Sequence, residues 1–253
     1  MISLRYFLLS ALFVAMLALG ESAASEPRPG SYIRDGESGT LVIRRDSHNK
    51  LVFRIESIGG NCHQCGVSGV IRGSVAHADD ESEIKSGPQC AIAFSSTASG
   101  VDVHPTTEVE CRAYCGARAG FDGTYRVPPA ACTSAGRQAA RDRALRSHRA
   151  HRYADAATTL KTLLTDCAPF IGWIEIDQMR NDLALAQYRK GEFTQCLETL
   201  SATLGSKVDS VEELRAGGGK VYLPPCDFDN YSGVASATLF NKALCTNGMS
   251  PGR

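Results

Sequence analysis

The 253-residue sequence predicts an α+β protein in which a small antiparallel β-barrel or sandwich is followed by a domain of α-helical hairpins. Residues 30–127 contain short, closely spaced runs of alternating apolar and polar residues that are separated by glycine-rich turns. From Arg137 onward the composition shifts to alanine, arginine and leucine. In that second part, residues 141–160 and 181–200 repeat one pattern at a distance of forty residues.

Residues 1–24 are predicted to be a signal peptide. Arg5 precedes a run of apolar residues at 7–19, and Ser22-Ala23-Ala24 offers small side chains where a signal peptidase cleaves. The apolar run is short for a hydrocarbon layer of about 30 Å, so a retained anchor is the less favoured interpretation. Cleavage after Ala24, with no cysteine at the new N-terminus, predicts a periplasmic or secreted protein without a lipid anchor or a further membrane span.

Residues 30–127 are expected to form a cysteine-rich β domain without helices. Alternation in residues 41–43 and 51–55, on either side of a polar turn, predicts a β-hairpin with one buried face. The further strand candidates are residues 67–76, 89–94, 101–104 and 108–114.

Residues 128–136 are expected to be a linker, because Pro128 and Pro129 cannot donate hydrogen bonds to a sheet. A helical-repeat domain is predicted over residues 137–249. Its helices are expected at residues 136–149, 152–166, 172–189, 192–204 and 234–246. The glycine- and proline-rich residues 216–233 are expected to form a long loop.

The forty-residue repeat matches at six of twenty aligned positions. Aromatic and small residues also correspond, with Tyr153 opposite Phe193 and Ala156 opposite Cys196. The identical pairs are Asp142/Asp182, Ala144/Ala184, Leu145/Leu185, Arg149/Arg189, Thr159/Thr199 and Leu160/Leu200.

These positions resemble a tetratricopeptide-type repeat. Gly191, Phe193, Cys196 and Leu200 are similar to that family's pattern of glycine, aromatic, small and large residues, although the family's spacing is about thirty-four residues and His151 takes the place of the glycine in the first unit. The resemblance implies a stack of helical hairpins with a concave, protein-binding face.

The β domain resembles the periplasmic lysozyme-inhibitor group, a second and weaker resemblance. It rests on the glycine and cysteine punctuation and on the segment from Cys111 and Cys115 to Tyr125. No residue of an inhibitory loop can be matched, so the resemblance implies only a fold and a class of partner.

Ten cysteines in an oxidising compartment predict five disulfides of unknown pairing. Six lie in residues 62–132 and four in 167–245, so each segment can pair internally, which favours two domains. The cysteines are Cys62, Cys65, Cys90, Cys111, Cys115, Cys132, Cys167, Cys196, Cys226 and Cys245.

Cys62 and Cys65 form a Cys-x-x-Cys motif that could serve thiol–disulfide exchange. A glycine-rich context without a βαβ unit favours structural disulfides instead. A metal site with His63, His77 or His104 is a third possibility, but no second Cys-x-x-Cys accompanies the motif, and no metal or cofactor is predicted.

Six arginines within sixteen residues form a candidate anion-binding face, because guanidiniums match the paired oxygens of phosphates or carboxylates. A solvated helix face is the favoured alternative. These residues are Arg137, Arg141, Arg143, Arg146, Arg149 and Arg152.

Twenty-seven basic and twenty-seven acidic residues balance, so charge does not direct the chain to nucleic acid, and no motif of a known catalytic site identifies a catalytic residue. The sequence therefore predicts a non-enzymatic exported protein that binds an envelope or extracellular protein, and binding or inhibition of a cell-wall hydrolase such as lysozyme is one candidate role. The alternative is an envelope thiol–disulfide oxidoreductase that uses Cys62 and Cys65.

Overall fold

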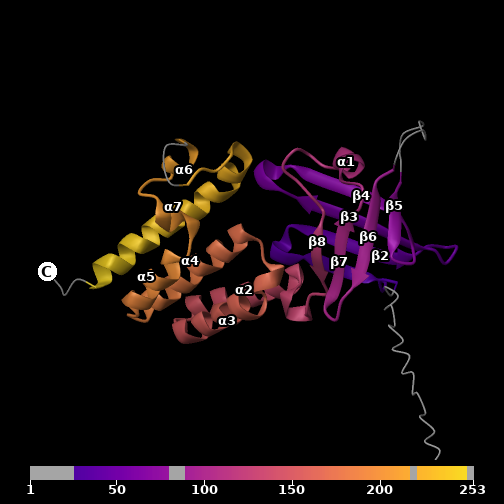
Figure 1. Cartoon of the computed structure of the whole chain (residues 1–253). Helices are drawn as coiled ribbons and strands as arrows, with labels where there is room; N and C mark the ends of the chain where they lie inside the picture. Colours follow the sequence, from indigo (N-terminus) through magenta and orange to yellow (C-terminus); the bar gives the residue numbers. More distant parts are fainter. Residues whose placement is uncertain (1–25, 80–88, 217–220, 250–253) are drawn as a thin grey trace, which may run out of the picture.

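The computed structural model describes residues 26–79, 89–216 and 221–249, and has a β-barrel at one end and a bundle of helices at the other (Figure 1). The predicted signal peptide and the Gly217–Lys220 segment lie outside the described residues. Within those residues, none of the helices combines the length and apolar character of a membrane span.

Eight antiparallel strands form a closed barrel, in which each strand pairs with the next and β8 returns to β1. This architecture confirms the predicted antiparallel β-barrel and excludes the sandwich. The strands are β1 (Gly30–Arg34), β2 (Gly39–Arg45), β3 (Leu51–Ile58), β4 (Gln64–Arg72), β5 (Val75–Ala78), β6 (Ala91–Ser96), β7 (Gly100–Pro105) and β8 (Gly123–Arg126).

Side chains fill the inside of the barrel. Strand alternation turns Leu41 and Ile43 inward, opposite Ile55 and Phe53 of β3, and all four are at most 3% exposed. On the facing wall, Phe94 packs edge-on against Phe53 at 5.0 Å between ring centroids. The barrel interior is therefore a hydrophobic core.

Two strand predictions in this domain are wrong in detail. Residues 67–76 belong to two strands, because Gly73 adopts a φ of +67° and turns β4 into β5. Residues 108–114 form a turn of helix, α1 (Glu108–Cys111), and a 3₁₀ turn, η3 (Arg112–Tyr114).

The apparent alternation in 108–114 misled because Val109 is exposed to solvent rather than buried. Cys111 ends α1, whereas Cys115 follows η3 in an extended conformation, and their disulfides to Cys90 and Cys65 tie this segment to the barrel.

The helices beyond residue 133 largely follow the predicted pattern. They are α2 (Ser134–Arg149), α3 (Tyr153–Asp166), α4 (Trp173–Arg189), α5 (Phe193–Ser201), α6 (Glu213–Ala216) and α7 (Pro225–Met249). The expected loop at 216–233 is wrong from Pro225 onward, since α7 begins there. Proline is favoured at the first helical position because its missing N–H has no partner there in any helix.

The forty-residue repeat corresponds to two helical hairpins, α2–α3 and α4–α5. His151 and Gly191 occupy equivalent turns and both adopt left-handed φ values, +59° and +78°. Ala156 and Cys196 are buried at the equivalent positions behind these turns. The final helix, α7, packs against α4 and α5.

The two parts of the molecule are joined at two places. On one side Ile33 of β1 packs against the helical cluster that contains Phe170 and the Cys132–Cys167 disulfide. On the other side the start of α7 lies next to the barrel (Figure 1), and the Cys62–Cys226 disulfide links the two. A cleft lies between the two junctions.

Candidate binding groove

A cleft of about 720 Å³ separates the end of the barrel from the first turns of α2, α4 and α7. A second hollow of about 320 Å³ lies over α2, α3 and α4. Gln138 and Arg141 line both, so the two hollows adjoin. We call the combined hollow the groove.

Helix α2 forms one wall of the groove along most of its length. The lining residues recur mostly at helical spacing, at positions 134, 137, 138, 141, 142, 144, 145 and 148. Fourteen residues separate Ser134 from His148, which corresponds to about 21 Å of helix and to about six residues of extended peptide.

Two exposed apolar side chains lie in the cleft. Ile58, at the end of β3, is 58% exposed, and Trp173, at the start of α4, is 44% exposed. The Trp173 ring lies 5.0 Å from the buried ring of Tyr231 in α7, which restricts its orientation. The cleft therefore offers apolar contact surface contributed by both parts of the molecule.

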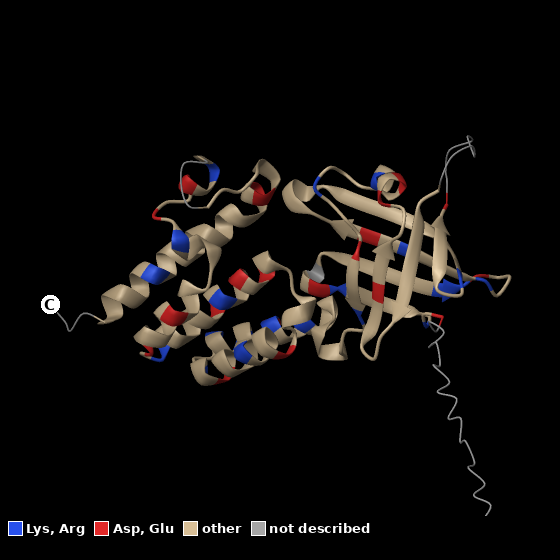
Figure 2. Ribbon diagram, in the orientation of Figure 1, with Lys and Arg blue, Asp and Glu red and all other residues tan. Residues whose placement is uncertain are grey.

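The groove carries an excess of negative charge. Its charged residues are four carboxylates, Asp142, Glu175, Asp182 and Asp227, and two guanidiniums, Arg137 and Arg141. Over the molecule as a whole, charges of both signs are interspersed (Figure 2). The groove therefore has a net charge of about −2 from these six residues, counted from its four carboxylates and two guanidiniums.

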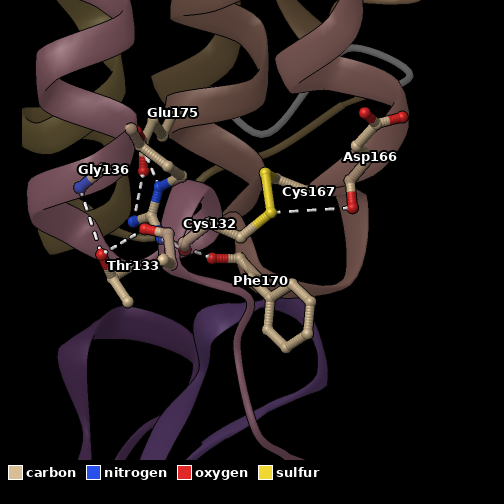
Figure 3. The surroundings of a disulfide bond; sticks show 9 residues. Cys132, Thr133, Gly136, Asp166, Cys167, Phe170 and Glu175 are labelled. Carbon is tan, nitrogen blue, oxygen red and sulfur yellow. Dashed lines mark hydrogen bonds and ion pairs between the residues drawn. A yellow bond between two sulfur atoms is a disulfide. The ribbon is translucent and has the colours of Figure 1, made fainter.

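Arg137 is buried and has a structural role. Its Nη2 lies 2.9 Å from Glu175, and its Nη1 donates to the carbonyl oxygens of Cys132 and Phe170. Figure 3 shows this network beside the Cys132–Cys167 disulfide. The guanidinium thus joins α2, the start of α4 and the 3₁₀ turn η5 (Ala168–Phe170).

Four titratable residues line the second hollow, namely Arg141, Asp142, His148 and Asp182. Arg141 lies 3.5 Å from both the Asp182 carboxylate and the Gln178 amide oxygen. Partial burial raises the pKa of Asp182, and the charge of Arg141 opposes this shift. Partial burial, followed by the charge of Arg189, lowers the pKa of His148, whose Nε2 has no hydrogen-bond partner among the described residues.

The structure does not bring the six predicted arginines together. Arg137 is buried and Arg141 lies in the groove, whereas Arg152 pairs with Asp155 beyond the end of α2. Arg143 and Arg146 are exposed and are not among the residues that line the groove. Arg149 is exposed in the last turn, where a positive charge complements the helix dipole.

All ten cysteines form disulfides, and two of the five bridges cross the segments that were expected to pair internally. The bridges are Cys62–Cys226, Cys65–Cys115, Cys90–Cys111, Cys132–Cys167 and Cys196–Cys245. Two crossing bridges leave an even number of cysteines on each side, which is why counting cysteines could not detect them. The thiol–disulfide alternative requires Cys62 and Cys65 to pair with each other. Instead, each is bonded to a different cysteine.

The described residues contain no group of three or more His, Cys, Asp or Glu side chains placed to hold a metal ion. A third hollow, of about 400 Å³, lies at the end of the barrel beneath α1, and Cys111 and Cys115 line it as disulfide cysteines.

Most of the groove residues were not predicted from the sequence. Two of the repeated pairs, Asp142/Asp182 and Leu145/Leu185, line the groove rather than the helical core, which was a usable signal. Trp173, the only tryptophan, had no marker beyond its place before a predicted helix. Ile58 had only a weak marker, because it is an apolar residue at an outward-facing position of β3.

Comparison of the chain with known protein families, curated proteins and solved structures finds no match.

Proposed function

We propose that this chain is an exported, non-enzymatic protein that binds an envelope or extracellular protein through the groove. Five disulfides suit an oxidising compartment. The observation that carries the proposal is the adjoining pair of hollows, with exposed Ile58 and Trp173 in one and the repeated Asp142/Asp182 and Leu145/Leu185 pairs in the other.

The shape of the groove suits an extended polypeptide segment of about six residues. A large apolar side chain of that segment would contact Trp173 and Ile58, since aromatic residues in clefts contribute much of the binding energy of protein interfaces. The excess of carboxylates favours a basic side chain further along, near Asp142 and Asp182. A cell-wall hydrolase with such a surface segment is one candidate partner.

Binding should be measured with the mature protein against purified lysozyme and against envelope or extracellular proteins captured from extract. Trp173→Ala should weaken binding at least tenfold, because it removes the aromatic contact from the cleft. The double change Asp142→Asn and Asp182→Asn should slow association and reduce its salt dependence.

Matched controls lie outside the groove. Phe240→Ala removes an aromatic that is 64% exposed on α7, and Glu198→Gln removes an exposed charge on α5. Both should bind as the wild type does. Equal binding by the groove variants and the wild type would overturn the proposal, as would a wild type that captures no protein and leaves lysozyme activity unchanged.

A further inference from the structure

We infer that the Cys62–Cys226 disulfide is a site of thiol–disulfide exchange with a dithiol reductant, and that its reduction opens the groove. This inference concerns the shape of the groove and goes beyond the proposed binding function. It assigns a reactive role to a different pair from Cys62 and Cys65.

Access separates this bridge from the other four. Cys62 lines the cleft, and both Cys62 and Cys226 are partly exposed. Each of the other four bridges has at least one cysteine that is no more than 3% exposed. A reductant in solution therefore reaches the Cys62–Cys226 bridge most easily.

The surroundings of Cys226 suit a leaving thiolate. Cys226 is the second residue of α7, a helix of 25 residues whose N-terminus stabilises negative charge. The Asn230 side-chain amide lies 3.7 Å from the Cys226 sulfur and 3.4 Å from the Cys62 sulfur, and can donate a hydrogen bond to either.

Because Cys226 and not Cys62 lies at a helix N-terminus, Cys226 is the better leaving group in the exchange. One thiolate of the dithiol attacks the Cys62 sulfur, the Cys62–Cys226 bond breaks, and Cys226 leaves as a thiolate. The second thiol of the reagent, once deprotonated, attacks the reagent's own sulfur in the mixed disulfide and releases Cys62. Two electrons and the two thiol protons pass to Cys62 and Cys226, and the reagent becomes a disulfide.

Backbone geometry connects this reaction to the groove. Asn61 and Cys62 both adopt left-handed φ values, +56° and +57°, which residues other than glycine rarely adopt unless the surroundings hold them. Their position is fixed by α7, because the Asn61 N–H donates to Asp227 at 2.8 Å and the Asn61 side chain accepts from the Cys226 N–H at 3.0 Å.

Loss of the covalent bond leaves these two hydrogen bonds and the contact of the Asn230 amide with the Cys62 sulfur, in partly exposed surroundings, to hold this side of the cleft. The opposite junction, where Ile33 packs beside the Cys132–Cys167 bridge, stays covalently linked through residues 127–133. The barrel can then pivot about that junction, which widens the cleft between Ile58 and Trp173.

The test titrates the oxidised protein with dithiothreitol, traps free thiols by alkylation and maps them by mass spectrometry. Half-reduction of Cys62–Cys226 should need at least tenfold less reductant than any other bridge. Trp173 emission should shift to longer wavelength in the same step, because this only tryptophan lines the cleft. The far-ultraviolet circular dichroism should stay unchanged.

The double variant Cys62→Ser/Cys226→Ser should show the shifted emission and a larger radius of gyration in solution without any reductant. The matched variant Cys196→Ser/Cys245→Ser, which lacks a bridge within the helical part, should keep the wild-type response.

The inference is wrong if Cys62–Cys226 is reduced together with or after the other bridges. It is also wrong if the double variant, folded by circular dichroism, has the emission and radius of the oxidised wild type. No partner protein enters these measurements, so their outcome is separate from that of the binding assay.

Discussion

Individual side chains in this protein serve purposes that their type alone does not reveal. The six arginines at 137–152 look alike in sequence, yet one is buried in a network, one lies in the groove and one pairs beyond the end of α2. A similar network lies behind the groove, where Tyr231 donates to Asp177 at 2.7 Å. Burial, and then the bond to Asp177, raise the pKa of Tyr231.

Replacing Arg137 by alanine should destabilise the fold by about 3–5 kcal/mol, because breaking a buried ion pair leaves its partner uncompensated. The change removes the pairing of Glu175 and a donor to the Cys132 and Phe170 carbonyls. Denaturant unfolding of the variant measures the loss. Arg143→Ala, on the exposed face of the same helix, should stay within about 0.5 kcal/mol of the wild type. Similar effects of the two changes would contradict the role assigned to Arg137.

His148 should make stability depend on pH. The pKa of this imidazole is lowered in the fold, chiefly by burial and then by Arg189, so the unfolded chain binds the proton more tightly. The contribution of His148 is present above its unfolded pKa of about 6.5 and is lost as pH falls through the lower folded pKa.

Nearby groups act on the same titration. Asp182 opposes the shift of His148, and His151 reinforces it. The free energy of unfolding should be measured from pH 8 to pH 5 for the wild type and for His148→Gln. The wild type should lose more stability than the variant over this range, and parallel curves would rule out a role for His148.

The helical hairpins show how one backbone requirement can be met by two residue types. The turns after α2 and α4 both need a left-handed residue, which is His151 in the first and Gly191 in the second. Glycine adopts this conformation without a steric penalty, whereas another residue costs about 1–2 kcal/mol. The two hairpins therefore share the same turn conformation, although only the second turn has a glycine.

Opposite substitutions at these two turns should have opposite effects. Gly191→Ala should lower the free energy of unfolding by about 1–2 kcal/mol, because it places a Cβ at a φ of +78°. His151→Gly should raise the free energy of unfolding by up to about 1 kcal/mol. The gain is reduced by the loss of the contact between His151 and the Tyr153 hydroxyl. Thermal unfolding measures both. Changes of the same sign would show that these turns are not equivalent.

At the scale of the whole molecule, disulfides join elements that lie far apart in the chain. Helix α7 carries a bridge near each end, Cys226 to the barrel and Cys245 to α5. The barrel and the helices each have their own hydrophobic clusters. The barrel and the helices are held together at the junctions at Ile33 and at Cys62, and the groove lies between these two junctions.

Removing the bridge between Cys62 and Cys226 should lower stability without unfolding either part. Closing a loop with a sequence separation of 164 residues contributes up to about 5 kcal/mol in the chain-entropy model. In the Cys62→Ser/Cys226→Ser variant, calorimetry should resolve separate transitions for the barrel and the helices. A single transition at the wild-type temperature would contradict this prediction.

The sequence by itself determined the class of the fold. Alternation in β2 and β3 specifies a sheet with one buried face, and the forty-residue repeat specifies two similar helical hairpins, because both patterns are local and periodic. Ten cysteines also indicated five bridges.

Only the tertiary structure decided which cysteines pair, where α7 begins and where the groove lies. Disulfide pairing depends on which residues meet in space, and the Cys62–Cys226 bond joins residues with a sequence separation of 164. Pro225 can begin a helix because packing and a bridge near each end stabilise α7. The groove combines Ile58 of the barrel with Trp173 of the helices, and no local pattern relates two residues that become neighbours only when the two parts are joined.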